Sequence, residues 1–588
     1  MHPSILGGAM ATCLIMELFL QLVSTVLYST YAYGDGTPRS LSTYTSTVST
    51  VLVRSLVIRT LTHVIGTYEH TPGPTLPAQQ HPGRHGRGVR EILTIPLTLS
   101  LLLSVSVCLF YYLARITAQY NALVRDCTEY ESESSSMEKH IVFDGALTRP
   151  DLLVLKNLAK DVELVDVLDS DSATGRDSGI GSEVSSQHDE ELAQLDEAGG
   201  GTLDTTAKDV ALLKAMRDPS SDSFEPTVLL TVDDYSAHVS PAIDRYILQP
   251  YVAWARKVAR YDTDVAMINH LIIYFTTSVP SAVFLYRHFT YTHGVLHTAM
   301  QFYLLGTYTL MMHQHIHQRG ILAKRFALLD KLFPYILDPL MGHSWNTYYY
   351  HHVKHHHVEG NGPEDLSSTL RYQRDSALHF LHYVGRFFFL VWLDLPLYFV
   401  RKNRPMMAVK SLGWECLTYL FYYTMATRFG GKATTFVYLL PFLLLRLGLM
   451  VGNWGQHAFV DADEPDSDFR SSITLVDVAS NRFCFNDGYH TSHHLNPLRH
   501  WRDHPISFLE QKKTYAKEGA LVFHNIDFLM ITLRLVLKDY EHLAKCLVPM
   551  GDQIRLTMDG RIALLKKLTR RFSEEEIQEK FRKGRKSS

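Results

Sequence analysis

The chain has 588 residues, a formal net charge of -3 and a pI near 6.9, a balance that predicts no strong attraction to nucleic acid. Its six cysteines are scattered without a CxxC pair, which argues against a disulfide framework or a zinc ribbon. The hydrophobic fraction of 46% is ordinary as an average, but it conceals very apolar segments beside polar ones.

Two apolar runs near the N-terminus, residues 10–32 and 92–114, reach the roughly 20 residues that a membrane-crossing helix needs. The first run lacks the basic leader of a secretory signal, so we interpret it as an anchor. Between them, residues 40–65 are apolar but rich in Ser, Thr and Arg, and interfacial, re-entrant and disordered states stay open. Residues 1–125 are therefore predicted to be a hydrophobic extension with one or two extra membrane helices.

Residues 126–240 are acidic and rich in serine, with too few apolar side chains to offset the entropy cost of ordering. We expect a mostly disordered segment, apart from two amphipathic helical islands at 152–158 and 210–216. The string DSGIGS at 177–182 is similar to a doubly phosphorylated degron read by ubiquitin ligases. An incidental Ser/Gly/Asp string is the favoured alternative.

Beyond residue 261 the chain again becomes membrane-like, in five apolar runs. These runs are residues 266–286, 295–312, 377–400, 412–427 and 434–451. The first two are predicted to form a helical hairpin that closes near His288. The chain after His494 is expected to be largely soluble, with a basic cytosolic tail over residues 546–588.

Nine histidines form four clusters at the ends of these runs, and imidazole is a neutral nitrogen ligand that suits iron. The nine are His313, His317, His352, His355, His356, His457, His490, His493 and His494. On a helix, positions three and four apart share one face, so each cluster can aim its imidazoles at one point. Nine nitrogens are too many for one ion but suit two.

Some ligand positions stay open in the sequence. His315 competes with His313 in the string HQHIH, and His351 competes with His352 in the string HHVKHHH. Asn453 lies one helical turn before His457, where it could hold a water ligand.

Parity constrains the membrane topology. The first two histidine clusters can meet the last two only if an even number of crossings separates them, yet three apolar runs lie between. Residues 377–400 carry Arg386, Asp394 and Pro396, and charges at mid-membrane are costly. We therefore expect this run to lie along the interface, which leaves four crossings in this part of the chain.

Lys and Arg residues gather on the histidine-bearing side, which predicts that this side faces the cytosol. They are Arg245, Arg256, Lys257, Arg260, Arg319, Lys324 and Arg325. The arginines between residues 54 and 90 disagree with this orientation unless residues 40–65 change the number of crossings. An integral membrane protein, in the endoplasmic reticulum, is the expected setting.

The histidine clusters resemble the boxes HxxxH, HxxHH and HxxHH of the membrane fatty acid desaturase family, over about residues 261–501. The Asn453-x-x-x-His457 element is similar to that of stearoyl-CoA desaturase, and Asp487-Gly-Tyr-His490 resembles the opening of its last box. The resemblance implies an all-α, integral membrane fold, with a four-crossing helical core and a cytosolic helical cap that holds a di-iron site. The desaturase domain would span residues 241–545.

The same resemblance implies an O2-dependent oxidoreductase that introduces a double bond into a fatty acyl chain of a lipid or acyl-CoA. It implies two iron ions as cofactors, O2 as co-substrate and a separate electron donor such as cytochrome b5 or ferredoxin. A fused cytochrome b5 is rejected, because the fragment HPGR at 81–84 has the wrong fourth residue. A fatty acyl or lipid hydroxylase and, from another class, a His-rich zinc transporter or metal-binding membrane protein are the alternatives.

Overall fold

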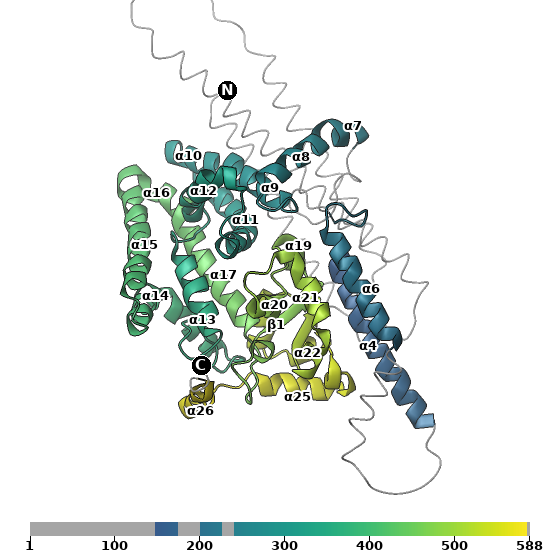
Figure 1. Ribbon diagram of the computed structural model, residues 1–588. Helices are drawn as coiled ribbons and strands as arrows, with labels where there is room; N and C mark the ends of the chain where they lie inside the picture. Colours follow the sequence, from purple (N-terminus) through teal and green to yellow (C-terminus); the bar gives the residue numbers. More distant parts are fainter. Residues whose placement is uncertain (1–140, 142–147, 175–199, 226–239, 585–588) are drawn as a thin grey trace, which may run out of the picture.

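The computed structural model describes residue 141 and residues 148–174, 200–225 and 240–584. The predicted N-terminal anchors, the residues 40–65, the DSGIGS string and the last four residues lie outside this part of the chain. Within it the protein is mostly helical, as the sequence predicts, with three short strands in addition. Figure 1 shows helices α14–α16 (residues 377–434) on one side and a cap that includes α19–α22 and α25 (within residues 479–568) on the other, with α17 (Leu440–Gln456) between them.

The first membrane-length hairpin is formed by α9 (Val265–Ile273), which continues through a π-helical turn into α10 (Val279–Arg287), and by α11 (Tyr291–Gln318). Three contacts in antiparallel order join its arms: Ser281 to His297, Ser278 to Gln301 and Tyr274 to Tyr308. Hydrogen bonds between buried polar side chains hold such helices together where apolar surfaces give little preference for one another.

A second hairpin is formed by α15 (Pro405–Thr424) and α17 (Leu440–Gln456). The chain reverses at Gly430, whose φ of 139° lies in a region that favours glycine. Tyr422 stacks on Tyr438, and Glu415 forms an ion pair with Arg446 farther from the turn. The contacts therefore run in antiparallel order away from the reversal.

Helix α14 (Ala377–Arg401) packs against α15 and α17. Near its start, the Tyr383 hydroxyl donates to the Ser367 carbonyl, and near its end the Tyr398 hydroxyl donates to Glu359. Just beyond the helix, Lys402 forms an ion pair with Glu359. Both ends of α14 thus contact the same segment, residues 359–367.

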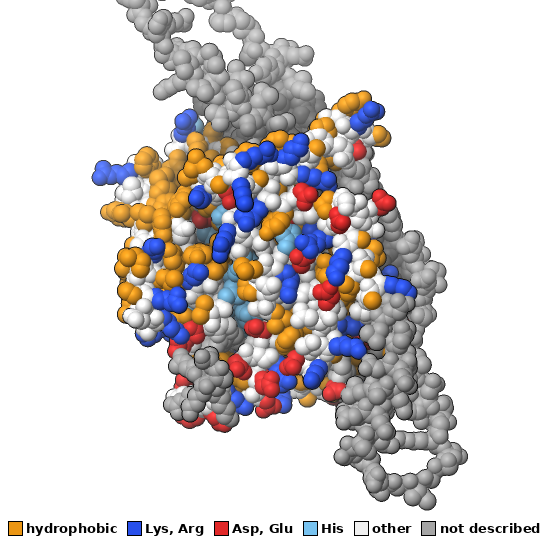
Figure 2. Space-filling view, viewed as in Figure 1, with side chains coloured by type: hydrophobic (Ala, Val, Ile, Leu, Met, Phe, Trp, Pro, Cys, Tyr) orange, Lys and Arg blue, Asp and Glu red, His pale blue; other side chains and the backbone are white. Residues whose placement is uncertain are grey.

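Three segments are long and apolar enough to cross a membrane: Val265–Arg287, Ala377–Arg401 and Pro405–Gln456, the last of which contains the reversal at Gly430. Figure 2 shows hydrophobic side chains gathered over α14–α16, with histidine side chains near the middle of the molecule and acidic and basic side chains over the cap. This distribution supports membrane association.

The cap contains a small buried sheet that the all-α prediction does not include. Strand β1 (Ile473–Val476) pairs in parallel with β2 (Leu521–His524), which pairs antiparallel with β3 (Leu547–Val548). The Leu475 amide donates to the Gly488 carbonyl at 2.7 Å, so the sheet also fixes the turn before the last histidine cluster.

Shorter helices surround these elements. Before and between the hairpins lie α7 (Pro241–Ile243), η3 (Asp244–Leu248), α8 (Gln249–Val258), η4 (Tyr274–Ser278), η5 (Lys324–Phe326), α12 (Ala327–Leu340), η6 (Tyr349–His356), α13 (His357–Glu359), η7 (Met425–Gly430), α16 (Gly431–Thr434) and η8 (Thr435–Leu439). The cap includes α18 (Asp468–Ser471), α19 (Ala479–Phe483), α20 (His490–Leu495), η9 (Trp501–Asp503), α21 (His504–Glu510), α22 (Lys512–Lys517), α23 (Phe528–Val536), α24 (Tyr540–Lys545), η10 (Gly551–Arg555), α25 (Met558–Leu568) and α26 (Glu574–Gly584).

The acidic segment forms two helices that are longer than the predicted islands. These are α4 (Arg149–Thr174) and α6 (Gly200–Arg217), which lie side by side in Figure 1. The Asn157 side chain of α4 donates to Asp209 of α6 at 2.7 Å. Apolar residues of both helices join a core with α21 and β1, so this pair is part of the folded molecule.

Candidate metal centre

Four segments far apart in sequence bring nine imidazoles into two adjacent groups. The first cluster consists of His313, His317, His352, His357 and His493, and the second cluster consists of His356, His457, His490 and His494. Within each cluster, one ligand nitrogen from every residue lies within 4.8 Å of all the others. Eight of the nine histidines chosen from the sequence are present, and His357 stands where His355 was expected.

The last turn of α11 supplies His313 and His317, which lie one helical turn apart and are both buried. The helix ends at Arg319, whose left-handed conformation turns the chain away from the site. His315, between them, points elsewhere: its Nε2 lies 3.1 Å from the backbone carbonyl oxygen of Asp330. The structure thus places His313, and not His315, in the first cluster.

The second box is wound as a π-helix, η6, and this winding selects its cluster residues. The His357 amide donates to the His352 carbonyl, five residues earlier, so these two side chains share one face. Their Nε2 atoms lie 3.0 Å apart. We predicted His355 because the register His352, His355 and His356 reproduces the HxxHH box, whereas the π-helical winding puts His357 on the face of His352.

His355 faces away from both clusters. Its Nε2 is 3.2 Å from the Glu364 carbonyl oxygen and 3.1 Å from the Leu366 amide nitrogen, so this atom is engaged by backbone. Its Nδ1 lies 3.8 Å from Asp365, and the His351 ring lies beside it. His351, His355 and Asp365 form a third, smaller group behind the second cluster.

The short helix α20 serves both clusters. Nε2 of His493 lies 3.0 Å from Nε2 of His313 and 2.7 Å from Nε2 of His357, in the first cluster. His490 and His494 join the second cluster, where Nε2 of His490 is 3.3 Å from Nε2 of His457. Residues 356–357 and 493–494 are adjacent pairs whose members belong to different clusters.

In the second cluster, outer ring nitrogens face oxygen acceptors. His356 Nδ1 lies 2.8 Å from Asp365, His457 Nδ1 lies 2.7 Å from the Ser471 carbonyl oxygen, and His494 Nδ1 lies 3.5 Å from Asp468. An acceptor at Nδ1 holds the proton there and leaves the Nε2 lone pair free for a metal. The nearby imidazoles hold the pKa of the buried Asp365 carboxyl well below its usual range, even though burial acts in the opposite direction.

The donor set fits a pair of transition-metal ions. Nε2 of His317 and Nε2 of His494 are buried and have no hydrogen-bond partner among the described residues. Burial and the neighbouring imidazoles hold the pKa of His352, His357 and His493 well below the usual 6.5, so these rings are neutral at pH 7. Neutral imidazoles whose ring nitrogens converge within hydrogen-bonding distance of one another can exchange these contacts for a shared cation.

Three further polar side chains, Asn453, His500 and His504, have hydrogen-bond partners near the metal centre. Asn453 donates from its side-chain nitrogen to the Ser367 carbonyl at 2.8 Å and to the Tyr383 hydroxyl at 2.7 Å. This arrangement leaves its side-chain oxygen as the atom for a water ligand. Behind the last box, His504 Nδ1 lies 3.0 Å from the Ser492 hydroxyl, and His500 contacts Asp264 at 3.1 Å.

Residues 289–525 match the family model described as Fatty acid desaturase, and all nine histidines of the first and second clusters fall inside this range. This segment is a fatty acid desaturase domain. The comparisons with curated proteins and with solved structures gave no match. The family match supports an oxidoreductase function of the desaturase or hydroxylase type, and the two histidine clusters of the desaturase domain fit a di-iron site.

Proposed function

We propose that the protein is a membrane di-iron desaturase that introduces a double bond into a fatty acyl chain, using O2 and electrons from a separate donor. The observation that carries this proposal is the division of nine converging imidazoles into groups of five and four within a fatty acid desaturase domain. Two groups of this size suit two ions of four to six coordination.

The ligand set that we propose follows the geometry. His313, His317, His352, His357 and His493 hold one iron, and His356, His457, His490 and His494 hold the other. His357 thus replaces His355, and Asn453 adds a water-mediated contact. The iron pair supplies the reductive activation of O2 and the abstraction of hydrogen from an unactivated methylene group.

The chain's own residues orient this centre. Asp365 and the Ser471 carbonyl fix the rings of His356 and His457, so their Nε2 atoms stay aimed into the second cluster. Asn453 and Tyr383 tie α17 to α14 immediately beside the second cluster. These hydrogen bonds keep the metal site in one geometry while an acyl chain binds.

A four-crossing topology accounts for the contacts of α14. The two hairpins, α9–α11 and α15–α17, provide four arms of membrane-crossing length. Both ends of α14 touch residues 359–367, which also carry Asp365. A helix that crossed the bilayer would carry its two ends to opposite sides, so we assign α14 to the interface, although it is long and apolar enough to cross. The Lys and Arg residues that gather near the histidines assign the metal centre to the cytosolic side, and we place the protein in the endoplasmic reticulum.

The zinc-transporter alternative fits this geometry less well. Transporters place ionisable ligands within their crossing helices, along the path of the ion. In this chain His317 lies in the last turn of α11 and His457 directly follows α17, at helix ends. The remaining cluster residues lie in η6, α13 and α20.

The decisive experiment expresses the full chain in a host with simple lipids and profiles its acyl chains. We expect a new unsaturated product that requires O2, and about two irons per purified chain. The variant His493→Ala should make none. A hydroxylated product would establish the alternative reaction, and a chain that binds only zinc and makes no product would contradict the proposed function.

A further inference from the structure

The α4–α6 pair lies outside the desaturase domain in sequence, yet it packs directly behind the last histidine cluster. Val154, Leu155 and Leu158 of α4 are almost fully buried, in a core shared with Val476 of β1 and with α21. Figure 1 shows α4 and α6 running along the cap beside α21. Apolar burial of this kind attaches the pair to the cap.

Charged contacts add to this attachment at the middle of α4 and at the end of α6. Lys512 reaches Asp161 at 2.8 Å, Lys214 reaches Glu510 at 2.6 Å, and Arg217 reaches Asp503 at 2.5 Å. Half-exposed ion pairs of this type contribute about 0–1 kcal/mol each, so they set the register more than the stability of the attachment.

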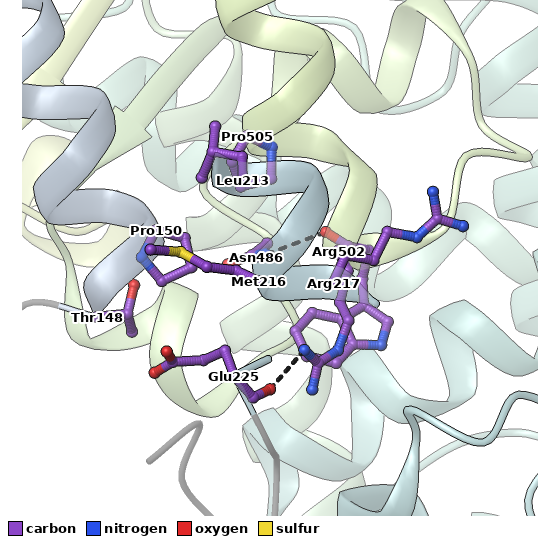
Figure 3. Close-up of a pocket in the computed structure, with 10 residues that line it drawn as sticks. Thr148, Pro150, Leu213, Met216, Arg217, Glu225, Asn486, Arg502 and Pro505 are labelled. Carbon is purple, nitrogen blue, oxygen red and sulfur yellow. Dashed lines mark hydrogen bonds between the residues drawn. The ribbon is translucent and has the colours of Figure 1, made fainter. Parts of the chain in front are cut away.

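A shallow pocket marks the seam at the end of α6. Figure 3 shows Thr148 and Pro150 on one side of it and Arg502 on the other, with Met216 and Asn486 between them. The Arg502 guanidinium donates to the Glu225 backbone carbonyl at 2.6 Å, and the Asn486 side chain donates to the Trp501 carbonyl at 3.0 Å. On the side of the cap, the pocket is therefore lined by Asn486 and Arg502, which lie shortly before and shortly after α20.

Asp151 of α4 is buried against the residues that precede α20, and 1% of its surface is exposed. The Tyr489 hydroxyl donates to one carboxylate oxygen at 2.7 Å, and the Asn481 side chain donates to the other at 3.2 Å. Burial raises the pKa of Asp151 to about 6, and these donors oppose that rise. A buried carboxylate is costly unless such donors satisfy it.

Both donors, Tyr489 and Asn481, are linked directly to the turn that precedes α20. Tyr489 directly precedes His490, the first residue of α20. Asn481 also accepts the Gly488 amide at 2.8 Å, and a Cβ atom on Gly488 would lie only 2.3 Å from this same oxygen. Asp151 therefore fixes both the phenol and the tight turn that set the start of α20.

We propose that Asp151 is a positioning residue for the metal centre, and that the α4–α6 pair is the support that holds α20 in register with α11, η6 and α17. This inference rests on the proposed metal-dependent function. Residues that hydrogen-bond to metal ligands typically change metal affinity by about 10–100-fold when they are removed. Asp151 acts on the turn that precedes the ligand His490, through Tyr489 and Asn481.

The test measures Co(II) binding to the purified full chain, for the wild type, Asp151→Asn, Tyr489→Phe and the double variant. We expect the affinity of one of the two sites to fall about 10–100-fold in each, with a changed Co(II) visible spectrum at saturation. Because the Tyr489 hydroxyl donates to Asp151, the effects of the two substitutions should be less than additive in the double variant. The matched control is Asp161→Asn, which removes a charged contact of α4 without touching Tyr489.

The outcomes separate the two ideas. A wild-type chain that binds no metal would overturn the proposed function and this inference together. A wild-type chain with two sites, and variants with unchanged affinity and spectrum, would overturn this inference alone. Equal losses in Asp161→Asn would also overturn it, since they would reveal a general effect on folding. If Asp151→Asn does not fold, Tyr489→Phe, which removes one hydroxyl, decides the question by itself.

Discussion

The two histidine clusters are adjacent but are built differently. In the first cluster, imidazoles contact one another, as His313 and His357 both do with His493 at 3.0 and 2.7 Å. In the second cluster, His356 and His457 are braced from behind by Asp365 and by the Ser471 carbonyl. The first cluster thus depends on the winding of its helices, and the second on hydrogen bonds that orient its rings.

The largest expected effect comes from separating the neighbours His493 and His494. His493→Ala should remove the metal of the first cluster and His494→Ala that of the second, because each ring faces a different group. Each purified variant should hold about one iron per chain and make no detectable product. Elemental analysis and lipid profiling measure these two quantities. Two irons retained in either variant would contradict the assignment of that residue.

The second prediction concerns the register of the second box. His357→Ala should abolish product formation, whereas His355→Ala should keep measurable activity, because only the His357 ring faces the first cluster. Both variants remove an imidazole from the same turn, so each serves as a control for the other, although His355 is fully buried and His357 only partly. Equal activities in the two variants would contradict the π-helical assignment.

Removal of a brace should have a smaller effect than removal of a ligand. Asp365→Asn keeps the shape of the side chain but loses the charge that holds the His356 ring, so metal affinity should fall about 10–100-fold. The loss should be confined to one of the two sites in a Co(II) titration. A uniform loss at both sites would show that Asp365 serves the fold and not the second cluster.

The last prediction concerns the pH dependence of stability. The buried imidazoles His352, His357 and His493 have pKa values lowered below 6.5 in the folded chain, so the unfolded chain binds more protons. Stability of the metal-free protein should therefore be full above pH 7 and fall as the pH drops below 6.5. At pH 5.5 each ring that stays neutral costs about 1.4 kcal/mol.

Thermal unfolding of the metal-free and metal-loaded chain at pH 7.5 and 5.5 measures this effect. The loaded chain should lose less stability over the same interval, because bound metal competes with protons for the same nitrogens. An increase in the stability of the metal-free chain at pH 5.5 would contradict the lowered pKa values.

Much of the site could be predicted from the sequence, because histidine spacing at helix ends is a local signal. His313 with His317, and His490 with His493 and His494, were identified in this way. The choice of His355 was made from the HxxHH pattern, although the string HHVKHHH is compatible with several registers, and the structure places His357 in the first cluster instead. Only the i+5 hydrogen bond from His357 to His352 selects one of them, and π-helical turns have no comparable sequence signature.

The fold was predicted least well where distant segments meet. The helical islands predicted at 152–158 and 210–216 lie within α4 and α6. Their composition did not indicate the full length of these helices or the elements against which they pack. The contact between Asp151 and Tyr489 spans 338 residues of sequence. No local pattern encodes such a pairing, and the short strands of the cap escaped prediction for the same reason.

The adjacent pairs His356–His357 and His493–His494 each send one ring to either cluster, so the two coordination sites share a covalent frame. Consecutive Cα atoms are 3.80 Å apart across a trans peptide bond, a length that neither temperature nor bilayer thickness alters. Sliding of the membrane helices past one another would therefore tilt both sites together without pulling them apart. The two candidate metal sites therefore keep a nearly constant separation, as the proposed reaction of two metal ions with one O2 molecule would require.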